Sequence, residues 1–256
     1  MNLELIVIGF FVGILVGMSG VGGGSIMTPL LILVLRINPL LAVGTDLLYS
    51  VPTKIYAALL HRRERTVDVQ LVKRLCLGGI PGAVVGLLSL VVLRRYVDLA
   101  ILNALVKHAV GLALLTSAVA IVGSLFLHKT VPPTRIEWKY GLSMRVVAAG
   151  AVVGFLVALT SIGSGSVTLP LLYLILPYVG LRQLIGSDIA FSALLIPVAA
   201  LGHLSMGDIN FAIVVSLLIG SLPGVFIGSK LCRMLPDFWL RPAVAVVMGL
   251  AGARLV

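Results

Sequence analysis

The sequence predicts an all-α polytopic membrane protein, and three observations support this fold class. Of the 256 residues, 60% are hydrophobic and only 11% are charged, whereas a soluble domain carries about 25% charged residues. Long apolar runs fill most of the chain, and a spanning helix needs about 20 such residues. Glycine-rich or charged stretches separate these runs. Soluble enzymes, disordered chains, nucleic-acid-binding modules and disulfide scaffolds are therefore excluded.

The first half contains five apolar runs before its only convincing linker. They are Leu3–Met18, Ser25–Leu35, Pro39–Leu60, Leu75–Leu93 and Leu99–Leu127. The second of these runs is too short to cross a core of about 30 Å as a helix, and it follows a glycine-rich break. We therefore expect a Gly-broken helix pair, with a re-entrant path left open, followed by three full spans.

The second half repeats this order. Its runs are Val146–Leu159, Val167–Leu176, Leu181–Leu204, Phe211–Ser229 and Leu240–Leu255, and the second is again short and preceded by a glycine-rich break. The polar segment between the halves carries Pro132 and Pro133. We divide the chain into a first membrane repeat (1–127), a linker (128–141) and a second membrane repeat (142–256).

Motifs recur in the two halves at a nearly constant offset. The run Gly22-Gly23-Gly24-Ser25 returns as Gly163-Ser164-Gly165-Ser166, 141 positions later. The run Gly44-Thr45-Asp46 returns as Gly186-Ser187-Asp188, 142 positions later. Composition alone does not keep such register, so we predict an internal repeat.

The charges indicate how the two halves are oriented. The chain has a formal net charge of +10, and most of its Lys and Arg residues lie between apolar runs. The loop His61–Arg74 is rich in them, whereas its counterpart His203–Asn210 has none. Because cytoplasmic loops are enriched in Lys and Arg, the two loops are expected on opposite sides. This predicts an inverted-topology repeat, an arrangement common in secondary transporters, with a cytoplasmic linker and both termini outside.

The glycine-rich breaks are the first candidate site. Glycine allows a helix to unwind, and the free N–H groups where the next helix begins form a ready anion site. We expect an anion to be held at these breaks by Gly22, Gly23, Gly24, Ser25, Gly163, Ser164, Gly165 and Ser166. The alternative is a tight helical hairpin packed on glycine that binds no ligand.

Four ionisable residues inside apolar runs are the second candidate site. Intramembrane carboxylates are costly and usually functional, so Asp46 and Asp188, each following a hydroxyl residue (Thr45 and Ser187), are candidates for coupling transport to protons. Lys54 and Lys107 have no cationic counterpart in the second half and could add positive charge to an anion site. The alternatives are aspartates that only cap broken helices and lysines that snorkel or pair with Asp46.

The paired glycine motifs resemble those of the TauE/SafE family of sulfite and organosulfonate permeases. The matching residues are Gly20-Val21-Gly22-Gly23-Gly24-Ser25, Pro29-Leu30-Leu31 and Ala42-Val43-Gly44-Thr45, then Ile162-Gly163-Ser164-Gly165-Ser166, Pro170-Leu171-Leu172 and Gly186-Ser187-Asp188. Ser164 departs from the family's usual consecutive glycines. The resemblance implies a multi-pass carrier for sulfur oxyanions in a bacterial or archaeal cytoplasmic membrane.

These observations predict a secondary transporter for a small anion, such as sulfite or an organosulfonate, that works by alternating access with proton coupling left open. One alternative is an anion channel that uses the glycine loops as a filter. Weaker alternatives are an intramembrane serine protease, because Gly17-Met18-Ser19-Gly20 matches GxSG, and a metal cation carrier. We expect no catalytic residue, metal site, cofactor or nucleic-acid partner. The expected partners are the small anion and the lipid bilayer, and formation of a homo-oligomer is left open.

Overall fold

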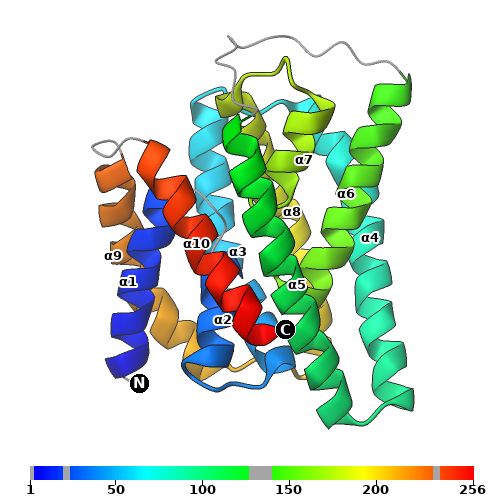
Figure 1. Ribbon diagram of the computed structural model, residues 1–256, viewed down its shortest axis with the longest axis vertical. Helices are drawn as coiled ribbons and strands as arrows, with labels where there is room; N and C mark the ends of the chain where they lie inside the picture. The colour runs from blue at the N-terminus through cyan, green and yellow to red at the C-terminus, as the bar shows by residue number, and fades with distance from the viewer. Residues whose placement is uncertain (1–2, 20–23, 127–139, 233–236) are drawn as a thin grey trace.

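The part of the chain that the structure describes folds almost entirely into helices. The computed structural model describes residues 3–19, 24–126, 140–232 and 237–256, and Figure 1 shows their arrangement as one bundle. The helices are α1 (Leu3–Ser19), α2 (Gly24–Leu33), α3 (Pro39–Arg63), α4 (Val69–Tyr96), α5 (Leu99–Phe126), α6 (Tyr140–Thr160), α7 (Thr168–Ile175), α8 (Leu181–Met206), α9 (Phe211–Cys232) and α10 (Asp237–Leu255).

Helices at equivalent positions of the two halves run in opposite directions. In Figure 1, α1, α3 and α5 begin at the lower end of the bundle, whereas α6, α8 and α10 begin at the upper end. Both termini lie toward the lower end. The predicted linker 128–141 lies outside the described residues except for Tyr140 and Gly141, which already belong to α6.

The two halves interlock rather than lying side by side. α1 packs against α9 of the second half, and α6 packs in the same way against α4 of the first. α3 packs against α8 at the centre of the bundle, and α5 packs against α10. The site residues of both halves are therefore brought together by the contact between α3 and α8.

Glycines allow the close approach of α6 to α4 and of α1 to α9. A Cβ atom on Gly150 would overlap the backbone of Leu75, and one on Gly9 would overlap the backbone of Leu217. Gly154 and Gly13 make equivalent contacts with Gly79 and Ser221 one turn later. Small residues at such spacing let membrane helices pack backbone to backbone.

Both short helices form where the sequence predicts them. α2 has 10 residues and α7 has 8 residues, so neither could cross a hydrocarbon core of about 30 Å. They pack against α3 and α8 respectively. Each short helix therefore ends beside the long helix that carries the aspartate of its own half.

Five helices in the described part are long and apolar enough to span a membrane: α4, α5, α6, α8 and α9. α3 has 25 residues, about 38 Å of helix, but it falls outside this set, and it carries buried Asp46 and Lys54 and a basic last turn. Large apolar side chains such as Leu77, Leu201 and Leu250 are exposed on the outer faces of the helices. The molecule is therefore an all-α polytopic membrane protein.

Candidate functional site

The start of α2 lies against the second helix break. A Cβ atom on Gly24, the first residue of α2, would overlap the backbone carbonyl of Ser161, which follows the end of α6. Only a glycine at this position lets the start of α2 approach the second break so closely. Gly22 and Gly23 lie outside the described residues, so the structure places only Gly24 and Ser25 of this motif.

Asp46 lies where the start of α2 and the second break meet α3. Its side chain is fully buried, and its Oδ2 atom accepts hydrogen bonds from Thr28 Oγ1 at 2.7 Å and from Ser161 Oγ at 2.6 Å. Thr28 belongs to the same half as Asp46, whereas Ser161 belongs to the other half. Ser161 has left-handed backbone geometry (φ 60°), which is uncommon for a residue with a side chain. The fold therefore holds this serine in an unusual conformation next to the carboxylate.

Three buried polar atoms of the described residues in this neighbourhood have no hydrogen-bond partner. They are Asp46 Oδ1, Ser25 Oγ and the phenol oxygen of Tyr49, which lies one turn along α3 from Asp46. Ser25 lies three residues before Thr28 on α2, so the two side chains share one helix face. We call Ser25, Thr28, Asp46 and Ser161 the Asp46 cluster. A buried polar atom without a partner is expensive, so the Asp46 cluster has unused capacity to bind a polar ligand.

The hydroxyl groups of the second break have hydrogen-bond partners within the protein. Gly165 has a positive φ of 83°, a geometry that glycine adopts readily. The hydroxyls of Ser164 and Ser192 lie 2.5 Å apart, and Ser117 Oγ donates to Ser166 Oγ at 3.3 Å. Ser166 is thus already paired with α5, whereas its counterpart Ser25 is not.

Asp188 occupies the equivalent place on α8. It is buried, and its Oδ1 atom also has no hydrogen-bond partner. Its electrostatic neighbours are the Lys54 ammonium, the Thr168 hydroxyl and the Gly165 backbone. We call Gly165, Thr168 and Asp188 the Asp188 cluster. The two clusters therefore differ in their electrostatic surroundings, because the Lys54 ammonium interacts more strongly with Asp188 than with Asp46.

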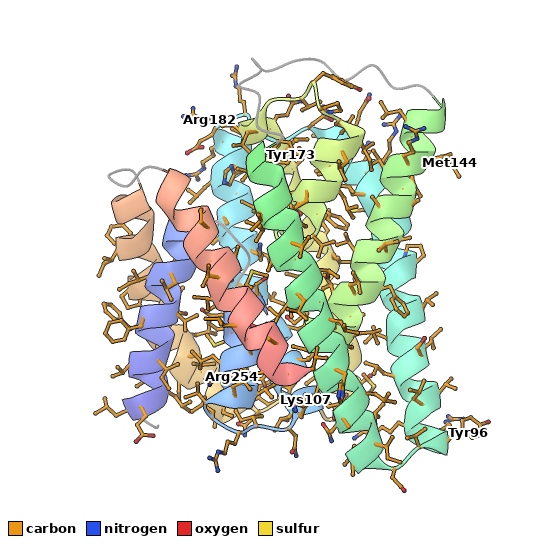
Figure 2. The ribbon with its side chains drawn as sticks, in the orientation of Figure 1. Tyr96, Lys107, Met144, Tyr173, Arg182 and Arg254 are labelled. Carbon is orange, nitrogen blue, oxygen red and sulfur yellow. The ribbon has the colours of Figure 1, made fainter. Side chains whose placement is uncertain are left out.

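Of the two candidate lysines, the structure brings only Lys54 to the site. Lys54 is 7% exposed, and the charges that act on its ammonium are the carboxylate of Asp188 first and that of Asp46 second. Lys107 is half-buried and lies near the lower end of the bundle (Figure 2). Among the described residues the one direct ion pair joins Arg94 to Asp208, so Lys54 touches neither carboxylate directly.

Thr45 and Ser187 hold loops rather than pointing at a ligand. The Thr45 hydroxyl accepts a hydrogen bond from the backbone N–H of Asn210 at 3.1 Å. The Ser187 hydroxyl accepts one from the backbone N–H of Asp68 at 2.9 Å. Each hydroxyl thus fastens the start of a helix from the opposite half, α9 or α4, to the central pair.

Four polar residues of the site were not predicted from the sequence: Thr28, Ser161, Thr168 and Ser192. Thr28 and Ser161 bond to Asp46, and Ser192 bonds both to Ser164 and, at 2.7 Å, to the backbone carbonyl of Asp188. Residues three or four apart share a face of a helix. Thr28 could therefore have been predicted from Ser25, and Ser192 from Asp188. No such signal links Ser161 to Asp46.

The protease alternative finds no support in this geometry. Ser19 ends α1, but its side chain lies outside the described residues. His108, the histidine that lies mid-span in the sequence, has an exposed side chain whose Nδ1 lies 2.6 Å from the Ala104 carbonyl of its own helix.

Among the described residues, no group of three His, Cys, Asp or Glu side chains could hold a metal ion.

Comparison with known proteins identifies relatives over the whole chain. The family model described as "Sulfite exporter TauE/SafE" matches residues 5–255. The chain is 39% identical to the probable membrane transporter protein YjnA of Bacillus subtilis (strain 168), with all of both chains covered. It is 26% identical to the probable membrane transporter protein YdhB of the same organism, covering 98% of this chain and 99% of YdhB.

An archaeal relative also matches nearly the whole chain. The probable membrane transporter protein MJ0441 of Methanocaldococcus jannaschii is 24% identical, over 97% of this chain and 92% of that protein. No solved structure matches the chain. The glycine-broken helix pairs, the buried site between the halves and these full-length matches lead to one conclusion: the chain belongs to the TauE/SafE sulfite exporter family of membrane transporters.

Proposed function

We propose that this protein is a secondary transporter that moves a small anion, sulfite or another sulfur oxyanion or organosulfonate, across the cytoplasmic membrane by alternating access. The observation that carries the proposal is the pair of buried, unpartnered polar atoms, Ser25 Oγ and Asp46 Oδ1, at the start of α2. The family match supports the substrate class.

The anion is proposed to bind at the first turn of α2. The N–H groups of a helix start and its dipole favour negative charge, and the Ser25 hydroxyl adds a donor in the same turn. Gly24 and the backbone of Gly163–Ser166 would complete the cradle, since the start of α2 touches the second break at Gly24 and Ser161. Lys54 would contribute positive charge from α3.

Alternating access is supported by the way the halves interlock. Equivalent helices run in opposite directions (Figure 1), and the α1–α9 contact has its equivalent in the α6–α4 contact. An inverted-topology repeat built in this way can rock one helix group against the other around a central site. Transport is proposed to be linked to protons through the buried carboxyl groups at that site.

Flux into proteoliposomes tests the proposed function. We expect saturable uptake of labelled sulfite or sulfoacetate, compared with taurine and sulfate, with and without an imposed pH gradient. Ser25→Ala should reduce the flux about tenfold, because it removes one hydrogen bond to a charged ligand. The matched control is Ser205→Ala, whose side chain is exposed and bonds to its own helix; it should leave flux unchanged.

The outcomes separate the candidate functions. Flux that does not saturate would favour an anion channel over a carrier. Absence of flux for every sulfur anion in the wild type would overturn the substrate class.

A further inference from the structure

The hydrogen bonds of Asp46 are distributed unequally between its two oxygens. Thr28 and Ser161 both donate to Oδ2, at 2.7 and 2.6 Å, whereas Oδ1 has no hydrogen-bond partner although it is fully buried. The Ser50 hydroxyl, one turn along α3, acts on the carboxyl group without making a hydrogen bond to Oδ1. A carboxylate accepts hydrogen bonds at both oxygens, but a carboxylic acid carries a proton on one of them and can donate. Because the hydroxyls of Thr28 and Ser161 both donate to Oδ2 and none donates to Oδ1, the arrangement matches a carboxylic acid that carries its proton on Oδ1.

The charge that acts on Asp46 is that of the Lys54 ammonium, which lies well along α3. On α3, the titratable neighbours of Asp46 are Tyr49 and Lys54. The Cα atom of Lys54 lies eight residues along the helix, about 12 Å away, and its ammonium is acted on more strongly by Asp188 of α8 than by Asp46.

α8 and the segment after it bring three titratable groups near this part of α3: Asp188, whose charge acts on Lys54, His203, which is buried beside Gly44, and Asp208, which pairs with Arg94. None of the three is among the groups that act on Asp46. α2 and residues 161–167 contribute hydroxyls and apolar groups, and residues 211–228 of α9 contain no charged residue. On α5, His108 is exposed, and Lys107 is not among the groups that act on Asp46. A buried carboxylate without an adjacent counter-charge pays a desolvation penalty of several kcal/mol, and protonation removes that penalty.

Building on the proposed anion transport, we propose that Asp46 binds the anion as a neutral carboxylic acid whose Oδ1–H group donates to it, while Asp188 serves as the counter-charge of Lys54. The pseudo-symmetric aspartates thus have different roles. The anion binds only when Asp46 holds its proton, so by linkage the anion and the proton bind together. If the proton leaves Oδ1 for water, the negative charge left on Asp46 repels the anion.

The free hydroxyl of Ser25 extends this donor set. Ser25 lies one turn from Thr28 on the face of α2 that meets Asp46, and its Oγ also lacks a partner. Ser25 Oγ–H and Asp46 Oδ1–H would then be two neutral donors in one dry site. Neutral donors allow an anion to be released as well as bound, whereas direct contact with Lys54 would hold it more tightly.

The test is the dissociation constant for methanesulfonate as a function of pH, measured on purified protein in detergent. Methanesulfonate keeps one negative charge throughout the pH range, so a pH dependence belongs to the protein. For the wild type, we expect binding to weaken by about tenfold per pH unit above the titration of Asp46. Asp46→Asn should bind with little pH dependence, because its amide N–H₂ supplies a permanent donor in place of Oδ1–H.

Two further variants complete the experiment. Asp46→Leu should lose binding, since the leucine side chain has the same branched shape as asparagine but no hydrogen-bond donor. Asp98→Asn is the matched control, because Asp98 is exposed between α4 and α5; it should behave as the wild type. Thermal unfolding of each variant shows whether a loss of binding reflects a loss of fold.

The results distinguish this inference from the function on which it rests. If the wild type binds neither methanesulfonate nor sulfite at any pH, the proposed function fails. If the wild type binds but a folded Asp46→Asn variant either keeps the wild-type pH dependence or loses binding altogether, the role given to Asp46 is wrong while anion binding stands. If Asp188→Asn, rather than Asp46→Asn, removes the pH dependence, the roles of the two aspartates are reversed.

Discussion

One buried lysine, Lys54, acts on the aspartates of both halves and has no counterpart in the second half. Asp46 and Asp188 repeat, as do Ser25 and Ser166, but at the position equivalent to Lys54 the second half has no cation. Lys54 nevertheless acts on the carboxylates of both halves. The charge distribution of the site is therefore less symmetric than its backbone.

Replacing each candidate lysine should show which of the two contributes to anion transport. Lys54→Met removes the buried positive charge and leaves Asp188 without its counter-charge, so we expect anion flux to fall by about 30-fold or more, as for truncation of one partner of a buried charge pair. Lys107→Met, at the half-buried position near the lower end (Figure 2), should retain most of the flux. Equal losses in the two variants, measured in the same proteoliposomes, would contradict this assignment.

At the element scale, the helix contacts between the halves depend on glycine at equivalent positions. The backbone of Leu75 would meet a Cβ on Gly150, and the backbone of Leu217 would meet one on Gly9. A backbone atom cannot rotate away as a side chain can. Any added methyl group must therefore move the helices apart.

We expect Gly150→Ala and Gly9→Ala each to lower the free energy of unfolding by about 1–3 kcal/mol, a typical cost of overpacking. Gly123→Ala is the matched control, since a Cβ there would meet nothing within 4 Å, and alanine favours a helix over glycine. Thermal unfolding in detergent measures all three. A loss of stability in Gly123→Ala equal to the other two would show that close helix contact is not the cause.

At the scale of the whole molecule, charge is distributed unequally between the two ends of the bundle. The upper end in Figure 1 holds the α3–α4 connection and the starts of α6 and α8, whereas the lower end holds the α4–α5 and α8–α9 connections and the end of α10. The described basic residues near the upper end are Arg62, Arg63, Arg65, Lys73, Arg74, Arg145 and Arg182; those near the lower end are Arg36, Arg94, Arg95, Lys107 and Arg254. The positive-inside rule therefore predicts that the upper end faces the cytoplasm.

Labelling of single cysteines in intact cells tests this orientation. With Cys76 and Cys232 replaced by serine, we expect Ser205→Cys, exposed at the lower end of α8, to react with a membrane-impermeant thiol reagent. Glu64→Cys, exposed at the upper end of α3, should react only after the cells are opened. Reaction of both cysteines in intact cells would contradict the opposed placement of the two loops, and the reverse pattern would invert the orientation.

The fold class, the two short helices and the family could all be predicted from the sequence alone, and the structure and the family match confirm them. These features follow from composition, from the length of apolar runs and from motif spacing, all of which are local to the chain. The sequence also located Ser25, Asp46, Lys54 and Asp188, because polar groups are conspicuous in apolar segments.

The contacts that these residues make could be read only from the folded structure. It showed that Ser161 crosses from the other half to Asp46, that Ser166 is paired while Ser25 is free, and that Lys54, not Lys107, faces the carboxylates. Helical periodicity defines which residues share a face of one helix, but not which face of another helix it meets. That pairing depends on the packing of α3 against α8 and on glycine contacts between residues far apart in the chain.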